Sequence, residues 1–192
     1  MSSTFTSPIR IFKRNNPTNN GVIAPDNTGA VKCSQEAQLL NPITATTATG
    51  VLAVKDVGGT TQASLIIPAG TMIQDVFIFQ TQAPSALTGG VVTVQVLTTN
   101  PSTGAVTTTG IGTFTFNTTG GVLGMTRTGN ATAAAAAVCA NVGTLDAEIQ
   151  FNLTTAITGT FTGTLDATFS VEYVARNVDG SITAYGSNYT NS

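Results

Sequence analysis

Histidine and tryptophan are absent from this 192-residue sequence, and charged side chains make up only 8% of it. Globular domains usually contain about 25% charged residues. Because histidine is the commonest general base and metal ligand, its absence excludes Ser-His-Asp and Cys-His catalysis and any histidine-ligated zinc site. Mechanisms based on lysine or on carboxylates are not excluded by composition.

Long apolar segments are missing as well. Residues 1–20 lack the apolar core of about 7–15 residues that a secretory signal needs, and no run approaches the ~18 apolar residues of a membrane span. We therefore expect a soluble protein made in the cytosol, with no membrane partner. In that reducing compartment Cys33 and Cys139 are expected to be small buried hydrophobes, and a disulfide between them is the less favoured alternative.

Threonine, alanine and glycine dominate the sequence instead, with 37, 23 and 20 residues. Threonine favours strands and glycine disfavours helices, and the 41% of hydrophobic residues are enough for a buried core. The composition predicts an all-β protein with a single domain over residues 29–192. Residues 1–28 are rich in turn signals and are expected to form an extended N-terminal arm and loop.

From residue 29 onward, strand-like runs alternate with Gly, Pro and Asn turns, a spacing typical of an antiparallel β-sandwich or barrel. In the two clearest runs, apolar and polar residues alternate, so each strand has one buried and one wet face. We expect Thr155–Gly159 to join these two as a hairpin. The predicted strands are 30–37, 51–55, 63–67, 71–82, 91–97, 111–117, 145–154 and 160–175.

The run 71–82 differs from the others because both of its faces are apolar. One face is expected to carry Met72, Val76 and Ile78. The other is expected to carry Ile73, Phe77 and Phe79. The run is either a central strand covered on both sides or a strand with one face against another subunit, and the two alternatives stay equal. Met72, Val76 and Ile78 are the candidate subunit-interface residues.

One helix is expected, within residues 130–141. This segment contains five consecutive alanines, and alanine is the best helix former. Because the segment is short, the helix should be a turn or two inside a crossover loop.

The charges are unevenly distributed along the chain. Arg10, Lys13 and Arg14 lie among the first fourteen residues, which contain no acid, whereas residues 76–126 contain no charged residue of either sign. Because interface cores are depleted in charge, that stretch indicates close neighbours; the alternative is that Thr, Gln and Asn simply solvate its strands. The net charge of −2 predicts no nucleic acid partner.

Asp146 and Glu148 share one face of a predicted strand, and paired carboxylates can perform glycosidase chemistry. This pair is the basis of a lectin or carbohydrate-active enzyme alternative. A solvated sheet face is the favoured interpretation, because the sequence shows no conspicuous aromatic platform for a sugar. We therefore predict no catalytic, cofactor-binding or metal-binding residues and expect the protein not to be an enzyme.

Residues 65–79 resemble a stretch of small virion structural proteins of tailed bacteriophages, especially marine ones. In this stretch an apolar strand is followed by the turn Pro68-Ala69-Gly70 and by a strand that opens Ile-x-x-Val. Residues 163–174, with the acidic turn at residues 179–181, look like the closing strand and turn of those proteins. The likeness covers about residues 50–180, and within that group the chain is most similar to head decoration (cement) proteins.

The resemblance implies a jelly-roll-like β-sandwich bound to the outside of the capsid. It implies that the protein is assembled in the bacterial cytoplasm and located in the virion, with the major capsid protein and further copies of itself as partners, trimers being favoured. Arg10, Lys13 and Arg14 would suit an acidic patch on the capsid. The alternative function is a tail or fibre component that binds a host surface glycan, because such components have the same charge-poor composition.

Overall fold

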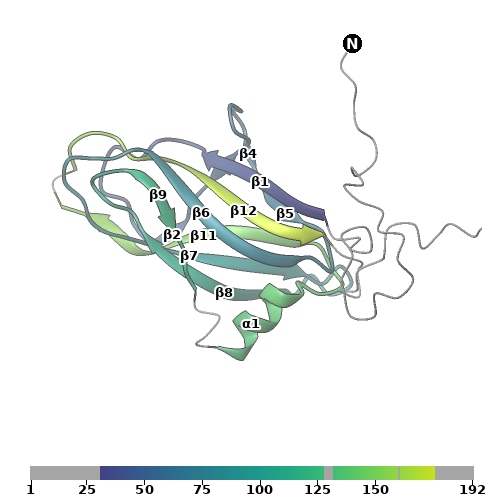
Figure 1. Cartoon of the computed structure of the whole chain (residues 1–192). Coiled ribbons are helices and arrows are strands. Elements are labelled where there is room, and N and C mark those ends of the chain that lie inside the picture. Colours follow the sequence, from purple (N-terminus) through teal and green to yellow (C-terminus); the bar gives the residue numbers. More distant parts are fainter. Residues whose placement is uncertain (1–30, 128–131, 160, 176–192) are drawn as a thin grey trace, which may run out of the picture.

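The computed structural model describes residues 31–127, 132–159 and 161–175 (Figure 1). The arm expected over residues 1–28, with Arg10, Lys13 and Arg14, lies outside the described residues. The described chain is mostly β structure, in two antiparallel sheets that pack as a sandwich, with one short helix at the side (Figure 1). The β-sandwich prediction is therefore confirmed.

We name the two sheets after their central strands. The β6 sheet has the strand order β4 (Gln62–Ala63), β3 (Val54–Lys55), β1 (Val31–Leu39), β12 (Asp166–Ala175), β6 (Met72–Gln82), β9 (Gly121–Gly124). The β7 sheet has the order β10 (Thr126–Arg127), β8 (Val106–Thr115), β7 (Thr88–Thr99), β11 (Ala147–Thr158), β2 (Gly50–Val51). The short strand β5 (Leu65–Ile67) also pairs with β11, beside β2.

The strand pairing is nested, as in a jelly roll. β1 pairs with β12, β2 and β5 pair with β11, β6 pairs with β9, and β7 pairs with β8. Two further pairings join these pairs into the two sheets. β12 also pairs with β6 in one sheet, and β11 also pairs with β7 in the other. Two sheets wound in this order form the double-sheet jelly roll, so this part of the fold prediction is confirmed too.

The polarity alternation that predicts β11 also sets its orientation. Ala147, Ile149, Phe151 and Leu153 are all buried, and the residues between them face outward. The hairpin expected at residues 155–159 is wrong, however. β11 continues to Thr158 and pairs with β7, while β12 belongs to the other sheet. Alternation identifies which face of a strand is buried, but it does not identify the strand's neighbours.

Aromatic rings join the two sheets in the core. Phe151 of the β7 sheet stacks on Phe169 of the β6 sheet, with ring centroids 4.0 Å apart and planes inclined by 20°. Phe114 lies 6.2 Å from Phe169 in a tilted arrangement and meets Phe116 edge to face at 5.5 Å. Offset-stacked and edge-to-face rings add about 0.5–1.5 kcal/mol per pair beyond the area they bury.

The two faces expected for residues 71–82 are partly wrong. Ile73, Val76 and Ile78 are buried together in the core, whereas Phe77 and Phe79 face outward. An irregularity in the β12–β6 pairing explains the difference, because consecutive residues of β12 pair with Asp75 and then with Ile73, so that one residue of β6 is skipped. Such a bulge shifts every later side chain to the opposite face.

The candidate interface residues change as a result. Val76 and Ile78 are fully buried in the core of the sandwich and cannot contact another subunit, while Met72 is half-buried. Neither is β6 covered on both sides by the described part of the chain, since Phe79 is exposed. A subunit interface on β6 stays a prediction. The large apolar residues that β6 turns outward are Phe77 and Phe79.

The predicted helix is confirmed as α1 (Ala133–Ala140), which lies in the crossover between β10 and β11. The hydroxyl oxygen of Thr132 caps it by accepting a hydrogen bond from the amide of Ala135, 3.2 Å away. Val138 and Cys139 pack against the core, and no disulfide joins Cys139 to Cys33. Within the described ranges, no helix has the length and hydropathy that crossing a membrane requires.

One buried polar side chain ties the β8–β9 connection to β6. Gln80 is only 2% exposed and donates from Nε2 to the carbonyl of Asn117 at 2.7 Å. Its Oε1 accepts from the amide of Asn117 at 3.1 Å. The side chain of Gln80 thus pairs with both backbone groups of Asn117, which would otherwise lose their partners next to the core.

We predict that Gln80→Leu lowers the free energy of unfolding by about 1–3 kcal/mol, because both backbone groups of Asn117 lose their partner. Thr71→Val is the matched comparison. The hydroxyl of Thr71 is buried and has no hydrogen-bond partner, so its removal should leave stability unchanged or slightly higher. Urea unfolding of both variants measures this, and equal losses would contradict the role of Gln80.

We predict that Phe169→Ala lowers the free energy of unfolding by about 3–5 kcal/mol, because it removes the ring shared by both sheets and leaves a cavity. Val57→Ala, at an exposed valine, should cost less than about 1 kcal/mol. Guanidinium unfolding of both variants is the measurement. Similar small losses would show that the aromatic cluster does not hold the sheets together.

Candidate functional site

Asp146 and Glu148, on which the carbohydrate alternative is based, have different neighbours. Asp146 precedes β11, and its Oδ1 accepts a hydrogen bond from the amide of Ala69 at 2.9 Å. Asp146 therefore anchors the turn between β5 and β6. Glu148 lies on β11, between Leu97 of β7 and Ile66 of β5. In the described ranges, no three His, Cys, Asp or Glu residues come together as a metal site would need.

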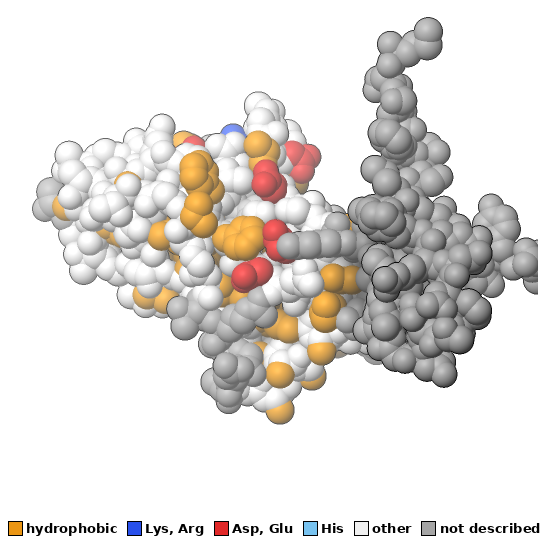
Figure 2. All heavy atoms as spheres, viewed as in Figure 1, with side chains coloured by type: hydrophobic (Ala, Val, Ile, Leu, Met, Phe, Trp, Pro, Cys, Tyr) orange, Lys and Arg blue, Asp and Glu red, His pale blue; other side chains and the backbone are white. Residues whose placement is uncertain are grey.

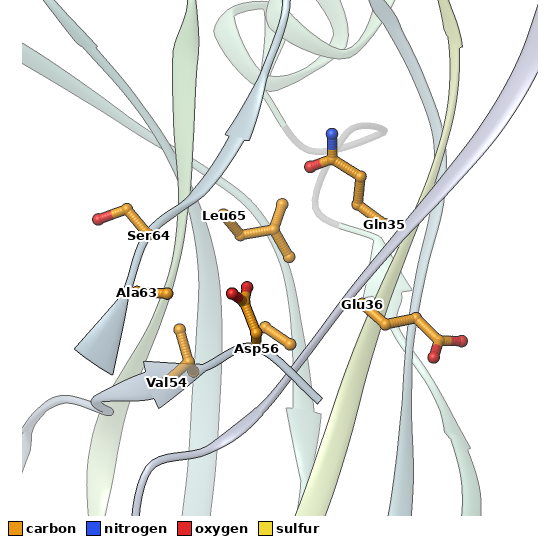
Figure 3. A pocket seen from close by; sticks show the side chains of 8 residues that line it. Gln35, Glu36, Val54, Asp56, Ala63, Ser64 and Leu65 are labelled. Atoms are coloured by element: carbon orange, nitrogen blue, oxygen red, sulfur yellow. The ribbon is translucent and has the colours of Figure 1, made fainter. Parts of the chain in front are cut away.

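A shallow hollow of about 190 Å³ lies where β1, β3 and β5 meet (Figure 3). In Figure 3 the carboxylate of Asp56 points into the hollow, while that of Glu36 points away from it. The hollow therefore presents one carboxylate among mostly aliphatic and amide groups, which is no set for paired acid–base chemistry. Its lining residues are Gln35, Glu36, Ala37, Val54, Asp56, Ala63, Ser64 and Leu65.

The more distinctive features are the two outer faces of the sandwich. On the β6 sheet, we define the aromatic patch as Phe77, Phe79 and Val122. Phe79 is 52% exposed and Val122 is 71% exposed, and the two lie directly opposite each other across the β6–β9 pair. Phe77 is half-buried two residues earlier, opposite Gly124. The patch therefore runs from the middle of the sheet to its edge at β9.

Acidic side chains lie beside the aromatic patch. Asp75 pairs with Glu172 across β6 and β12, two residues along β6 from Phe77. Glu36 of β1 pairs with Ser170, which in turn pairs with Phe77. Neighbours of this kind on one face of a sheet lie about 5–10 Å apart. Figure 2 shows the result, with hydrophobic and acidic side chains side by side over the β6 sheet.

The β7 sheet presents a different outer face, which we call the neutral face. Its outward side chains are mostly hydroxyls and amides, and Glu148 is its only acid among the described residues. Thr93 and Thr154 are close enough on it to share a hydrogen bond of 3.3 Å. The outward residues include Val106, Thr108, Thr113, Thr115, Val91, Thr93, Gln95, Leu97, Glu148, Gln150, Asn152 and Thr154.

The neutral face accounts for part of the charge-free stretch of the sequence, and the rest of that stretch belongs to β6 and β9 of the other sheet. Residues 76–126 include all of β7 and β8, which supply most of this face. The sequence identifies the stretch but not its neighbour β11, which adds Gln150 and Asn152 from far along the chain. Val122 of the aromatic patch was missed as well, because Gly120, Gly121 and Gly124 around it are typical of a turn.

A hydrogen bond joins two side chains of neighbouring strands of the β6 sheet, Gln35 of β1 and Tyr173 of β12. Gln35 donates from Nε2 to the hydroxyl of Tyr173 at 3.0 Å. Burial raises the pKa of the Tyr173 hydroxyl, the neighbouring thiol of Cys33 adds to the rise, and the hydrogen bond from Gln35 opposes it. Because a raised pKa keeps the phenol protonated, this group is a structural contact and not a source of tyrosinate.

No protein-family model, no curated protein and no solved structure matches the chain.

Tyr173 gives a prediction for alkaline solution. The pKa of its hydroxyl is higher in the folded chain than the usual value of about 10. The folded state therefore holds this proton more tightly, and the stability it contributes is present below pH 10 and is lost as the pH rises through the folded-state pKa. The free energy of unfolding should fall less steeply above about pH 10 in Tyr173→Phe than in the wild type. Parallel profiles from denaturant titrations would contradict this.

Proposed function

We propose that the chain is a non-enzymatic structural protein of a virion, which binds the outside of a tailed-phage capsid and decorates or stabilises it. The observation that carries the proposal is the neutral face. Exposed strand faces normally carry charged residues, whereas the cores of protein interfaces are depleted in them. The β7 sheet presents a broad face with a single acid among its described outward residues, and this favours a protein neighbour over water.

The chemistry of this face suits a protein contact. Amides such as Gln95 and Gln150 can both donate and accept hydrogen bonds, and Leu97 and Val91 add apolar area between them. An interface of this kind needs about one hydrogen bond per 100–200 Å² and little net charge. The neutral face offers both along three adjacent strands.

The fold agrees with this proposal but does not carry it. Viral capsid proteins, lectin domains and cupins all use the double-sheet jelly roll. Function has to be argued from surfaces, because one fold supports many unrelated activities. The virion assignment rests on the neutral face together with the resemblance of residues 65–79 and 163–174 to phage virion proteins.

The partners proposed are the major capsid protein and further copies of the chain, with a trimer as the favoured oligomer. Arg10, Lys13 and Arg14 are proposed to meet an acidic patch on the capsid. The neutral face would then contact a neighbouring protein on the particle. In this arrangement the cations of the N-terminal segment provide the electrostatic attraction to the capsid, and the neutral face of the folded domain provides the complementary surface.

We predict that Gln150→Lys weakens capsid binding by about tenfold, because it buries an unpaired cation in the contact. Gln62→Lys is the matched control, since it makes the same change at an exposed position at the end of β4. The measurement is the occupancy of purified, undecorated capsids over a series of protein concentrations. Equal occupancy for both variants would remove the neutral face from the contact, and binding to host glycans without any binding to capsids would overturn the proposal.

A further inference from the structure

The aromatic patch presents more apolar area to water than any contact within the described residues explains. Phe79 and Val122, which face each other across two strands, are each more than half exposed, and Phe77 continues the same stripe. Isolated exposed apolar residues are normal, but a contiguous group bordered by polar side chains indicates a binding surface. The question is what binds to it.

The acids beside the patch define the chemistry of its occupant. Glu36, Asp75 and Glu172 surround Phe77 on the same face, across three neighbouring strands. If a second copy placed its own β6 sheet against this one, the two groups of acids would meet, and juxtaposed like charges are costly. The surface fits a partner that combines apolar side chains with positive charge.

The chain contains one segment of that composition. Residues 8–14 read Pro-Ile-Arg-Ile-Phe-Lys-Arg, with three large apolar residues and three cations in seven positions. The other cations, Lys32, Lys55, Arg127 and Arg176, are scattered singly along the rest of the chain. The segment therefore combines the apolar side chains and the positive charge that this surface fits.

The segment can reach the patch of its own chain. Seventeen residue steps separate Arg14 from Val31, where β1 begins, and they can span about 55–60 Å when extended. Phe79 lies level with Gln38, seven residues along β1 from Val31 and two strands to the side. That path is only about 25 Å along the sheet and about 10 Å across it.

We propose that the segment Pro8–Arg14 binds the aromatic patch of its own chain, with Ile9, Ile11 and Phe12 against Phe77, Phe79 and Val122, and with its cations toward the acids of the β6 sheet. Tethering favours this occupant, because a segment on the same chain meets the patch at an effective concentration of about millimolar.

The inference goes beyond the proposed function. It concerns the free protein, in which the segment covers an apolar surface that would otherwise promote aggregation. On the particle the same cations are proposed to meet the capsid, so the segment would exchange one acidic surface for another. The two proposals can fail separately, because the first is tested on capsids and the second on the protein alone.

Trypsin cleavage of the full-length protein tests the inference, because Arg10, Lys13 and Arg14 are all trypsin sites. Cleavage of a covered segment tracks the fraction of time that it is released. Phe79→Ser should therefore increase the cleavage rate about tenfold, since it removes the more exposed of the two rings of the patch. Val106→Ser is the matched control, because Val106 is also an exposed apolar residue, at 55%, but lies on the other sheet. Its cleavage rate should equal that of the wild type.

A second pair of variants tests the charges. Glu36→Gln should accelerate cleavage and make it less sensitive to salt, whereas Glu148→Gln, on the neutral face, should change neither. Thermal unfolding checks that all four variants are folded. The inference is overturned if the wild type and Phe79→Ser are cleaved at the same rate. Protection that increases with protein concentration would also overturn it, by assigning the patch to the segment of a second copy.

Discussion

The contact between the stacked rings of Phe151 and Phe169 is the interaction on which the other features of the molecule depend. The two residues belong to consecutive strands of the chain, β11 and β12, but these strands lie in different sheets. Packing the rings 4.0 Å apart fixes which face of each strand is internal. Because side chains alternate along a strand, every neighbouring residue is then assigned to the core or to an outer face.

The two outer faces of the sandwich differ in chemistry. The neutral face of the β7 sheet offers hydroxyls and amides that can hydrogen-bond to a partner without burying charge. The β6 sheet combines the aromatic patch with Glu36, Asp75 and Glu172. One face thus suits a protein neighbour of little charge, and the other suits a basic, apolar segment. The low overall charge of the sequence does not reveal this difference between the two faces. The difference arises only when the strands are assembled in jelly-roll order.

Sequence reasoning predicts the parts of this fold that depend on local patterns. Alternation at residues 145–153 identifies the buried face of β11, and the alanine run identifies α1. It fails where the outcome depends on distant strands. The residue skipped before Asp75 reverses the faces of β6, and only the pairing with β12 reveals it. Likewise, the carboxylate of Asp146 accepts a hydrogen bond from the amide of Ala69, 77 positions away, and no local pattern indicates this contact.

We propose that the jelly roll is a structural component bound to the outside of a capsid through its neutral face. Electron cryo-microscopy of virions assembled with this chain tests it most directly, because the fold is large enough to be placed in a reconstruction. We expect density for the sandwich on the outer surface of the head, with β8, β7 and β11 against a neighbouring protein. Density on the tail or fibres, or a neutral face turned to solvent, would contradict it.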